Sequence, residues 1–93
     1  MRFVWDENKN KENRKKHGID FQDAVLVFND DNRIEFYDES HSEEEDRFDT
    51  IGMVEDILFV VYTERGPLTR IISARIATPK ERRLYYGRNV YDY

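Results

Sequence analysis

The stretch "LTRIISARIATPKERR", residues 68–83, carries the two clearest structural signals in this chain of 93 residues. Its first ten residues are mostly apolar and β-branched, which is typical of a strand. Thr78 then stands as a helix N-cap, Pro79 occupies the first helical position, and Glu81 completes a capping box. The stretch therefore predicts a strand that leads directly into a helix.

Three further strands are predicted upstream of this stretch. The turn "ERGP" separates it from "ILFVVYT", whose unbroken apolar run predicts a central strand buried on both faces. Two earlier segments, "RFDTIGM" and "RIEFYDE", also indicate strands, and the polar stretch "SHSEEED" between them indicates a solvated loop. Because these strands follow one another through short connections, they favour an antiparallel meander.

The N-terminal part predicts a short strand, "RFVW", and two helices. Asp6 can cap the first helix, which spans residues 7–17, is almost wholly polar and ends before Gly18. So polar a helix is expected to pack weakly. Asp20 can cap the second helix, whose predicted apolar face consists of Phe21, Ala24, Val25 and Phe28.

Together these elements predict an α+β fold, in which an antiparallel meander sheet is packed with two N-terminal helices and one C-terminal helix. A chain of this length predicts a single domain, residues 1–93. The absence of cysteine excludes disulfides and thiolate metal sites. The sequence has no apolar signal segment at its N-terminus and no apolar run long enough to cross a membrane, so we expect a cytoplasmic protein without a membrane role.

The formal net charge of −5 hides a strong segregation of charge along the chain. Residues 1–19 carry a net charge of +3, residues 20–56 carry −12, and residues 57–93 carry +4. The two basic ends can face a polyanion such as RNA, and the acidic middle can face a basic partner.

Several segments resemble BrnT toxins, in the same order along almost the whole chain. They begin with "FVWDENKNKENRKKHGIDFQDAVLVFND" and continue with "RFDTIG", "VVYTERG", "RIISARIAT" and "KERRLYY". The combination of "KHGIDF" with "RIISARIAT" is the most specific part of the resemblance. BrnT toxins are the toxin half of bacterial type II toxin–antitoxin pairs.

The resemblance implies a RelE-like ribonuclease fold and an endoribonuclease that cleaves RNA and inhibits translation. It also implies neutralisation by a BrnA-like antitoxin with a ribbon-helix-helix domain, so that DNA is bound only through the antitoxin complex. No cofactor and no metal are expected. The alternative is a non-catalytic binding module that tethers its antitoxin, which the net acidity of the chain favours.

RNA can be cleaved without a metal when its 2′-hydroxyl attacks the adjacent phosphate, provided that the protein moves two protons and stabilises negative charge. Histidine titrates closest to neutral pH, so His17 is the first catalytic candidate, and its place in "KHG" fits the resemblance. The alternative is that His17 only ends the first helix and interacts with the helix dipole.

Three arginines are the candidates for stabilising the phosphate: Arg65, Arg70 and Arg75. Arg75 is favoured most, because it stands in the otherwise apolar stretch "IISARIA". Arg70 and Arg75 are five residues apart and would point to opposite faces of a regular strand, so only a bulge would bring them together. The alternative is that each arginine forms an ordinary salt bridge.

Other charged residues are assigned to binding. Lys9 and Lys16 share one face of the first helix and are predicted to bind RNA, although both can simply be solvated. Arg82 and Arg83 are predicted to contact the partner protein. The loop "DESHSEEED" contains His41 and several carboxylates but lacks a recognisable ligand spacing, so no metal site is predicted there.

Overall fold

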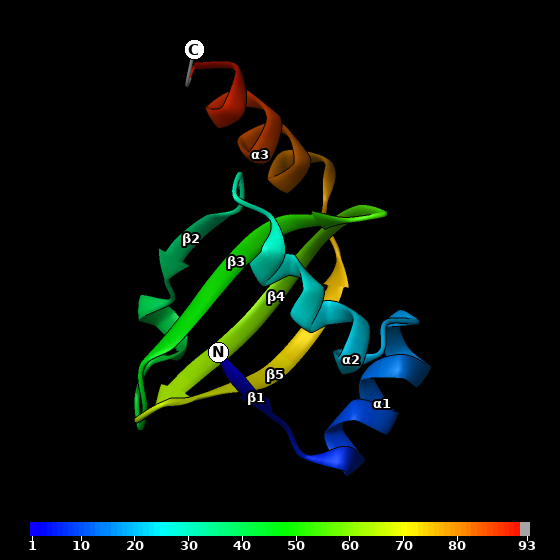
Figure 1. The fold of residues 1–93 in the computed structure, drawn as a ribbon, viewed down its shortest axis with the longest axis vertical. Helices are drawn as coiled ribbons and strands as arrows, with labels where there is room; N and C mark the ends of the chain where they lie inside the picture. Colours follow the sequence, from blue (N-terminus) through cyan, green and yellow to red (C-terminus); the bar gives the residue numbers. More distant parts are fainter. Residues whose placement is uncertain (92–93) are drawn as a thin grey trace.

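The computed structural model describes the backbone of residues 1–91 and the side chains of residues 1–87. Within this part of the chain, one five-stranded sheet has the order β1-β5-β4-β3-β2 (Figure 1). The strands are β1 (Arg2–Val4), β2 (Ile34–Tyr37), β3 (Arg47–Val54), β4 (Asp56–Arg65) and β5 (Leu68–Ile76). The central position predicted for the "ILFVVYT" strand is confirmed, because β4 lies in the middle of the sheet.

Three α-helices and two 3-10 helices connect or flank the strands: α1 (Glu7–His17), α2 (Phe21–Ala24), η1 (Val25–Asn29), η2 (Glu39–His41) and α3 (Pro79–Tyr91). In Figure 1, α2 crosses in front of the sheet, α1 lies beyond the β5 edge, and α3 extends away from one end of the sheet. The predicted α+β class is therefore confirmed. The second predicted helix is shorter than expected, since it gives way to a 3-10 helix at Val25.

The prediction of a purely antiparallel meander is wrong, because the sheet is mixed. Strands β2 to β5 pair antiparallel, whereas β1 pairs parallel with β5, with Phe3 opposite Thr69. The helical segment after β1 carries the chain across the sheet to β2 at the opposite edge. On its outer side, β5 pairs with β1, and this pairing extends over three residues, Arg2–Val4. The rest of the β5 edge has no strand beside it in the described part of the chain.

The main core lies between the sheet and the α2–η1 segment. Its fully buried residues include Phe21 and Val27 from this segment and Val60, Ile71 and Ala74 from the strands. Gly52 on β3 lies directly beneath Val27, and a Cβ atom at this position would overlap the Val27 side chain. Glycine at position 52 is thus required for the close approach of η1 to the sheet.

The polar helix α1 does not pack weakly, contrary to the expectation from its composition. Two buried asparagines attach it to the rest of the chain. Asn13 donates to the carbonyl oxygen of Ala74 at 2.8 Å and accepts from the Ala74 amide at 3.1 Å, so it satisfies the free edge of β5. Asn10 accepts from the Phe21 amide at 2.9 Å. Hydrogen bonds with the backbone therefore replace the apolar contacts that α1 cannot make.

Helix α3 covers one end of the opposite face of the sheet, where Ile34, Ile51, Ile57, Ala77 and Tyr85 form a second cluster. Its start confirms the predicted capping box. The Thr78 amide donates to Glu81 Oε1 at 2.8 Å, and the Glu81 amide donates to Thr78 Oγ1 at 3.2 Å. Farther along that face, Asp38 and His41, at the two ends of the short 3-10 helix η2, lie close to Asp49.

Candidate functional site

A β-bulge in β5 places Arg70 and Arg75 on the same face of the sheet. Val61 pairs with Ser73 but the next residue, Tyr62, pairs with Ile71, so Ile72 is the extra residue. The five-residue step between the two arginines therefore spans an even number of paired positions. Their partners on β4 are Thr63 and Phe59, which are four residues apart and point the same way.

The same register adds further polar residues to this face, because residues paired directly across strands share a face. Thr63 pairs with Arg47 as well as Arg70, and Val61 pairs with Asp49 as well as Ser73. We call this surface, opposite the α2–η1 segment, the open face. Its exposed or half-buried polar residues on β3, β4 and β5 include Arg47, Asp49, Arg65, Arg70, Ser73 and Arg75, and Thr63 is buried among them. All three sequence-predicted arginines lie on it.

Arg75 is held in a fixed orientation on the open face. It donates two hydrogen bonds to Glu81, at 2.7 and 2.9 Å, and its guanidinium lies 4.2 Å from the centre of the Phe59 ring. The hydrogen bonds to Glu81 raise the pKa of Arg75, so the group stays charged. A guanidinium has five N–H donors, and Glu81 and the Ile76 carbonyl take only three of those of Arg75.

The other two arginines differ in how far they are engaged. Arg65 is exposed and forms an ion pair with Glu45 at 3.1 Å, at the edge of the open face. Arg70 is half-buried, and its side chain makes no hydrogen bond or ion pair with any residue in the described part of the chain. Arg70 thus offers all its donors to a ligand.

Asp49 lies on the open face close to Arg75, Asp38 and His41. Its Oδ1 atom is buried without a hydrogen-bond partner. Burial, and secondarily the negative charge of Asp38, raise the pKa of Asp49 to about 6. Burial alone would also raise the pKa of Asp38, but hydrogen bonds with His41, Ser40 and Asp49 lower it overall. Below about pH 6, Asp49 therefore keeps its proton while the lowered pKa of Asp38 favours the ionised form of that carboxyl group.

His41 is oriented by the same pair of carboxyl groups. Its Nδ1 atom lies 3.1 Å from both carboxylate oxygens of Asp38 and 3.1 Å from the Ser40 hydroxyl. When Nδ1 carries the proton and donates it to Asp38, the Nε2 atom is left free to exchange a proton. The imidazole is 66% exposed, so a ligand can reach it.

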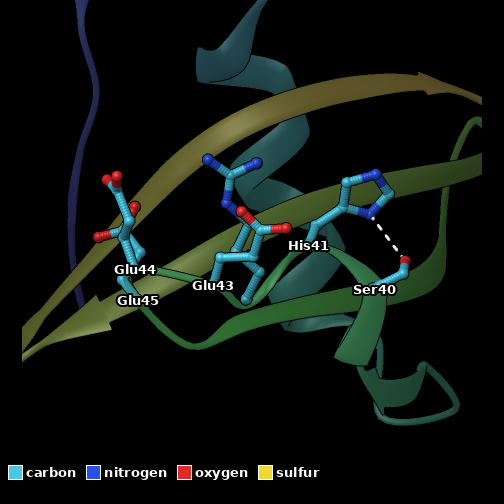
Figure 2. Close-up of a pocket in the computed structure, with 6 residues that line it drawn as sticks. Ser40, His41, Glu43, Glu44 and Glu45 are labelled. Carbon is cyan, nitrogen blue, oxygen red and sulfur yellow. Dashed lines mark hydrogen bonds between the residues drawn. The ribbon is translucent and has the colours of Figure 1, made fainter.

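A hollow of about 280 Å³ adjoins His41 and is lined by Ser40, His41, Glu43, Glu44, Glu45 and Arg47. Figure 2 shows Ser40 and His41 at one end of this hollow, Glu44 and Glu45 at the other, and Glu43 between them. The Nε atom of Arg47 is buried there without a hydrogen-bond partner. The glutamates make this hollow a poor site for a phosphate, so the phosphate is better placed over the arginines of the open face.

His17 and the two sequence-predicted lysines lie in a different place, along the edge of β5. A second hollow, of about 230 Å³, is lined by Lys9, Glu12, Asn13, Lys16, His17, Ile72 and Ser73. No hydrogen bond or ion pair joins His17 to Arg65, Arg70 or Arg75 among the residues described. The two groups meet only at Ser73, which belongs to both surfaces.

The remaining predicted residues, Arg82 and Arg83, lie on α3, just after Glu81, which binds Arg75. Arg82 donates to Asp56 at 2.6 Å and lies 6.0 Å from the Tyr86 ring centre, whereas Arg83 is exposed. In the described part of the chain, no group of three or more His, Cys, Asp or Glu residues is arranged to hold a metal ion. None of the helices described there is both long and apolar enough to span a membrane.

Sequence reasoning missed Asp49, Asp38 and His41 as a cluster. The stretch "DESHSEEED", which contains Asp38 and His41, was weighed only as a metal site, and Asp49 was visible only as a carboxylate in the predicted strand "RFDTIG". Asp38 and His41 belong to a loop that looked merely solvated, and their approach to Asp49 depends on the pairing of β2 with β3, in which Phe36 lies opposite Asp49.

Comparison of the sequence with known protein families indicates which reaction the open face can support. Residues 5–81 match the family described as "Ribonuclease toxin, BrnT, of type II toxin-antitoxin system". No curated protein matches the sequence. The family match begins just after β1, includes all of β2 to β5 and ends in the first turn of α3, and it therefore contains the whole of the open face from Arg47 to Arg75. The chain belongs to the BrnT family of ribonuclease toxins of type II toxin–antitoxin systems.

Proposed function

We propose that this chain is a metal-independent endoribonuclease toxin that cleaves RNA on the open face, inhibits translation in the cytoplasm, and is neutralised by a BrnA-like antitoxin with a ribbon-helix-helix domain. The observation that carries the proposal is the β5 bulge, which gathers Arg70 and Arg75 on the same face as Asp49. The relationship to RelE-like nucleases stays a prediction from the sequence.

The proposed reaction uses only groups of the protein and the RNA. The 2′-hydroxyl gives its proton to a base while its oxygen attacks the adjacent phosphorus, and the bond from phosphorus to the 5′-oxygen breaks. An acid returns a proton to the departing 5′-oxygen, which leaves a 2′,3′-cyclic phosphate and a 5′-hydroxyl. Arg70 and the unused donors of Arg75 would stabilise the extra negative charge on the phosphate oxygens.

Asp49 on the open face and His41 close to it are suited to moving the protons. The Nε2 atom of His41 can accept one while Asp38 holds the ring in place. Asp49, whose pKa is raised to about 6, can hold a proton much closer to neutral pH than an ordinary aspartate. We assign the proton transfers to these two residues, with His17 as the alternative to His41.

Lys9, Lys16 and His17 would bind the RNA backbone along the edge of β5. They line one hollow, and that hollow reaches the open face at Ser73. A strand of RNA that passes over Arg70 could therefore continue past these three residues. Two lysines and a histidine there would supply attraction to phosphates without sequence preference.

The test is cleavage of a synthetic RNA by the purified full chain in the presence of excess EDTA. We expect a 2′,3′-cyclic phosphate product, and at least a tenfold loss of cleavage rate for Arg70→Ala. This substitution removes no side-chain hydrogen bond or ion pair of the described structure, so the fold should be retained. Arg83→Ala is the matched control, because Arg83 is an exposed arginine on α3, outside the strands that carry the open face. Equal rates for Arg70→Ala and the unmodified chain would remove the open face as the site.

Separate variants of the two histidines assign the proton transfer. If His41 acts, His41→Ala loses most activity while His17→Ala loses only part of it through weaker RNA binding. The opposite ranking would move the chemistry to the β5 edge. Both variants need a folding control by circular dichroism, because His17 ends α1.

A non-catalytic binding module is the second candidate, and the ion pairs of the open face favour it. Arg75 and Arg65 already use donors on Glu81 and Glu45, as arginines with a structural role do. Expression in bacteria separates the two candidates. Growth arrest that a co-expressed antitoxin relieves supports the nuclease, and harmless expression of a folded chain supports the module.

A further inference from the structure

Four large apolar side chains are exposed at the end of the sheet where β3 turns into β4. Leu26, Met53, Ile76 and Tyr86 are between 43% and 46% exposed. Two hollows, of about 460 and 370 Å³, lie there, and Leu26 lines both of them. The first also contains Met53 and Tyr86, and the second contains Ile76. We call this continuous area, centred on Leu26, the Leu26 surface.

The border of the Leu26 surface is negatively charged. Asp30 lines the first hollow, and Asp23, Glu55 and Asp56 line the second. Asp30 and Asp56 are bound by Tyr85 and Arg82, but Asp23 and Glu55 make no side-chain hydrogen bond or ion pair with the residues that the structure describes. No lysine or arginine is among the residues lining the two hollows.

This surface is distinct from most of the open face. The β3–β4 turn lies at one end of β4, whereas Arg65 and the row that contains Arg70 lie towards the other end. The backbone of Glu55 in that turn has a positive φ of 62°, a conformation that non-glycine residues adopt only when the surrounding structure holds them there. The turn therefore places Glu55 beside the apolar residues of the second hollow.

We propose that the Leu26 surface is the docking site of the antitoxin, and that it binds an amphipathic segment whose apolar side chains are flanked by lysine or arginine. A type II toxin requires a protein partner, and an exposed apolar area with an acidic border matches a segment of that chemistry. The inference rests on the proposed pairing with an antitoxin but not on RNA cleavage.

Other occupants are opposed by the charge of the border. RNA and anionic lipid carry phosphates that Asp23 and Glu55 would repel. A second copy of this chain, related by a two-fold axis, would place one acidic border against another. Arg82, predicted from the sequence to contact the partner, borders the surface through its ion pair with Asp56, so it can lie next to the docked segment.

The experiment measures binding of the purified antitoxin encoded with this chain to the full chain, by titration calorimetry without RNA. We expect Leu26→Asp and Met53→Asp each to weaken binding about tenfold or more, because both place a charge in the apolar contact. Glu55→Lys should weaken binding and reduce its dependence on salt. Val4→Asp is the matched control for the Leu26 surface, since Val4 is an exposed apolar residue that lines neither hollow and pairs with Arg70 instead.

Arg70→Ala distinguishes the Leu26 surface from the open face as the docking site. Unchanged affinity for Arg70→Ala, with loss for the Leu26 and Met53 variants, supports the inference. Strong loss for Arg70→Ala with normal binding of the other variants would overturn it, because the antitoxin would then cover the open face. If Leu26→Asp fails to fold by circular dichroism, Met53→Asp and Glu55→Lys decide the question.

The inference and the proposed function can fail separately. A chain that binds antitoxin through the Leu26 surface but cleaves no RNA would refute the nuclease and leave this inference intact. Because neither Leu26 nor Met53 is assigned to RNA binding or to proton transfer, their variants should also keep the RNA cleavage rate of the unmodified chain when antitoxin is absent.

Discussion

Substitution of Asn13 by alanine tests how helix α1, which consists of polar residues, is held against the sheet. The Asn13 side chain is 6% exposed and makes three hydrogen bonds: to the carbonyl oxygens of Ile19 and Ala74, and from the amide of Ala74. Ala74 is fully buried, so neither of its backbone groups can turn to water when the asparagine is removed. Asn13→Ala therefore breaks all three bonds and leaves two unpaired groups at the β5 edge.

The expected cost follows from these contacts. A hydrogen bond contributes about 1 kcal/mol net, and a buried polar group left without a partner costs about 1–3 kcal/mol. We expect the free energy of unfolding to fall by about 2–4 kcal/mol, which corresponds to a melting temperature lower by roughly 10–25 °C for a domain of this size. Asn13→Asp should cost a similar amount, because it presents a carboxylate to two carbonyl oxygens.

The assay is urea unfolding followed by circular dichroism, with Asn8→Ala as the control. Asn8 is on the same helix but exposed, and in the described structure only its backbone amide is hydrogen-bonded, so its substitution should change stability by less than about 0.5 kcal/mol. If Asn13→Ala is as stable as Asn8→Ala, the asparagine bridge does not hold α1, and the placement of His17 and Lys16 beside Ser73 loses its support.

Two further predictions concern the sheet. The folded-state pKa of Asp49 is about 6, which lies above its ordinary value of 3.8. Between these two pH values the folded chain keeps a proton that the unfolded chain loses. The contribution of Asp49 to the free energy of unfolding therefore falls as pH rises from 4 to 6. Asp49→Asn should therefore lessen the loss of stability between pH 4.5 and 7 by about 1–2 kcal/mol, because the Asp38 carboxylate offsets part of the full effect. Urea unfolding midpoints of both proteins at the two pH values measure this difference. The same pH dependence in both proteins would contradict the prediction. Gly52→Ala should destabilise the chain by about 1–3 kcal/mol, because the added Cβ atom overlaps the Val27 side chain. Gly87→Ala in α3 is the control, because open space surrounds that position, and it should be neutral or stabilise the chain by up to about 1 kcal/mol. Thermal melting compares the two variants, and equal melting temperatures would count against the close approach of η1 to the sheet.

Local signals in the sequence predicted the elements better than their connections. The capping box at Thr78 and Glu81 was visible because its partners are three residues apart. The parallel pairing of β1 with β5 was not, because Phe3 and Thr69 are distant in the sequence and a three-residue strand can pair at any open edge. The docking of α1 was missed for a similar reason, since Asn13 bonds to a backbone group 61 residues away.

The candidate site shows the same division. The arginines were found from residue type, and the parity argument identified the bulge as the condition for bringing Arg70 and Arg75 together. The bulge itself leaves no mark in "RIISARIAT", because any residue of that strand can be the extra one. Asp49 and His41 were missed because their proximity arises from the loop between β2 and β3 folding back over the sheet.

The most direct test of the open face as the RNA site is a nuclear magnetic resonance titration of the full chain with RNA made uncleavable by 2′-O-methyl groups. The account predicts that the largest amide shifts fall on β3 near Asp49 and on β5 from Arg70 to Arg75, with smaller ones along α1 near Lys16. Shifts confined to the Leu26 surface, or binding without shifts on β3 and β5, would contradict it.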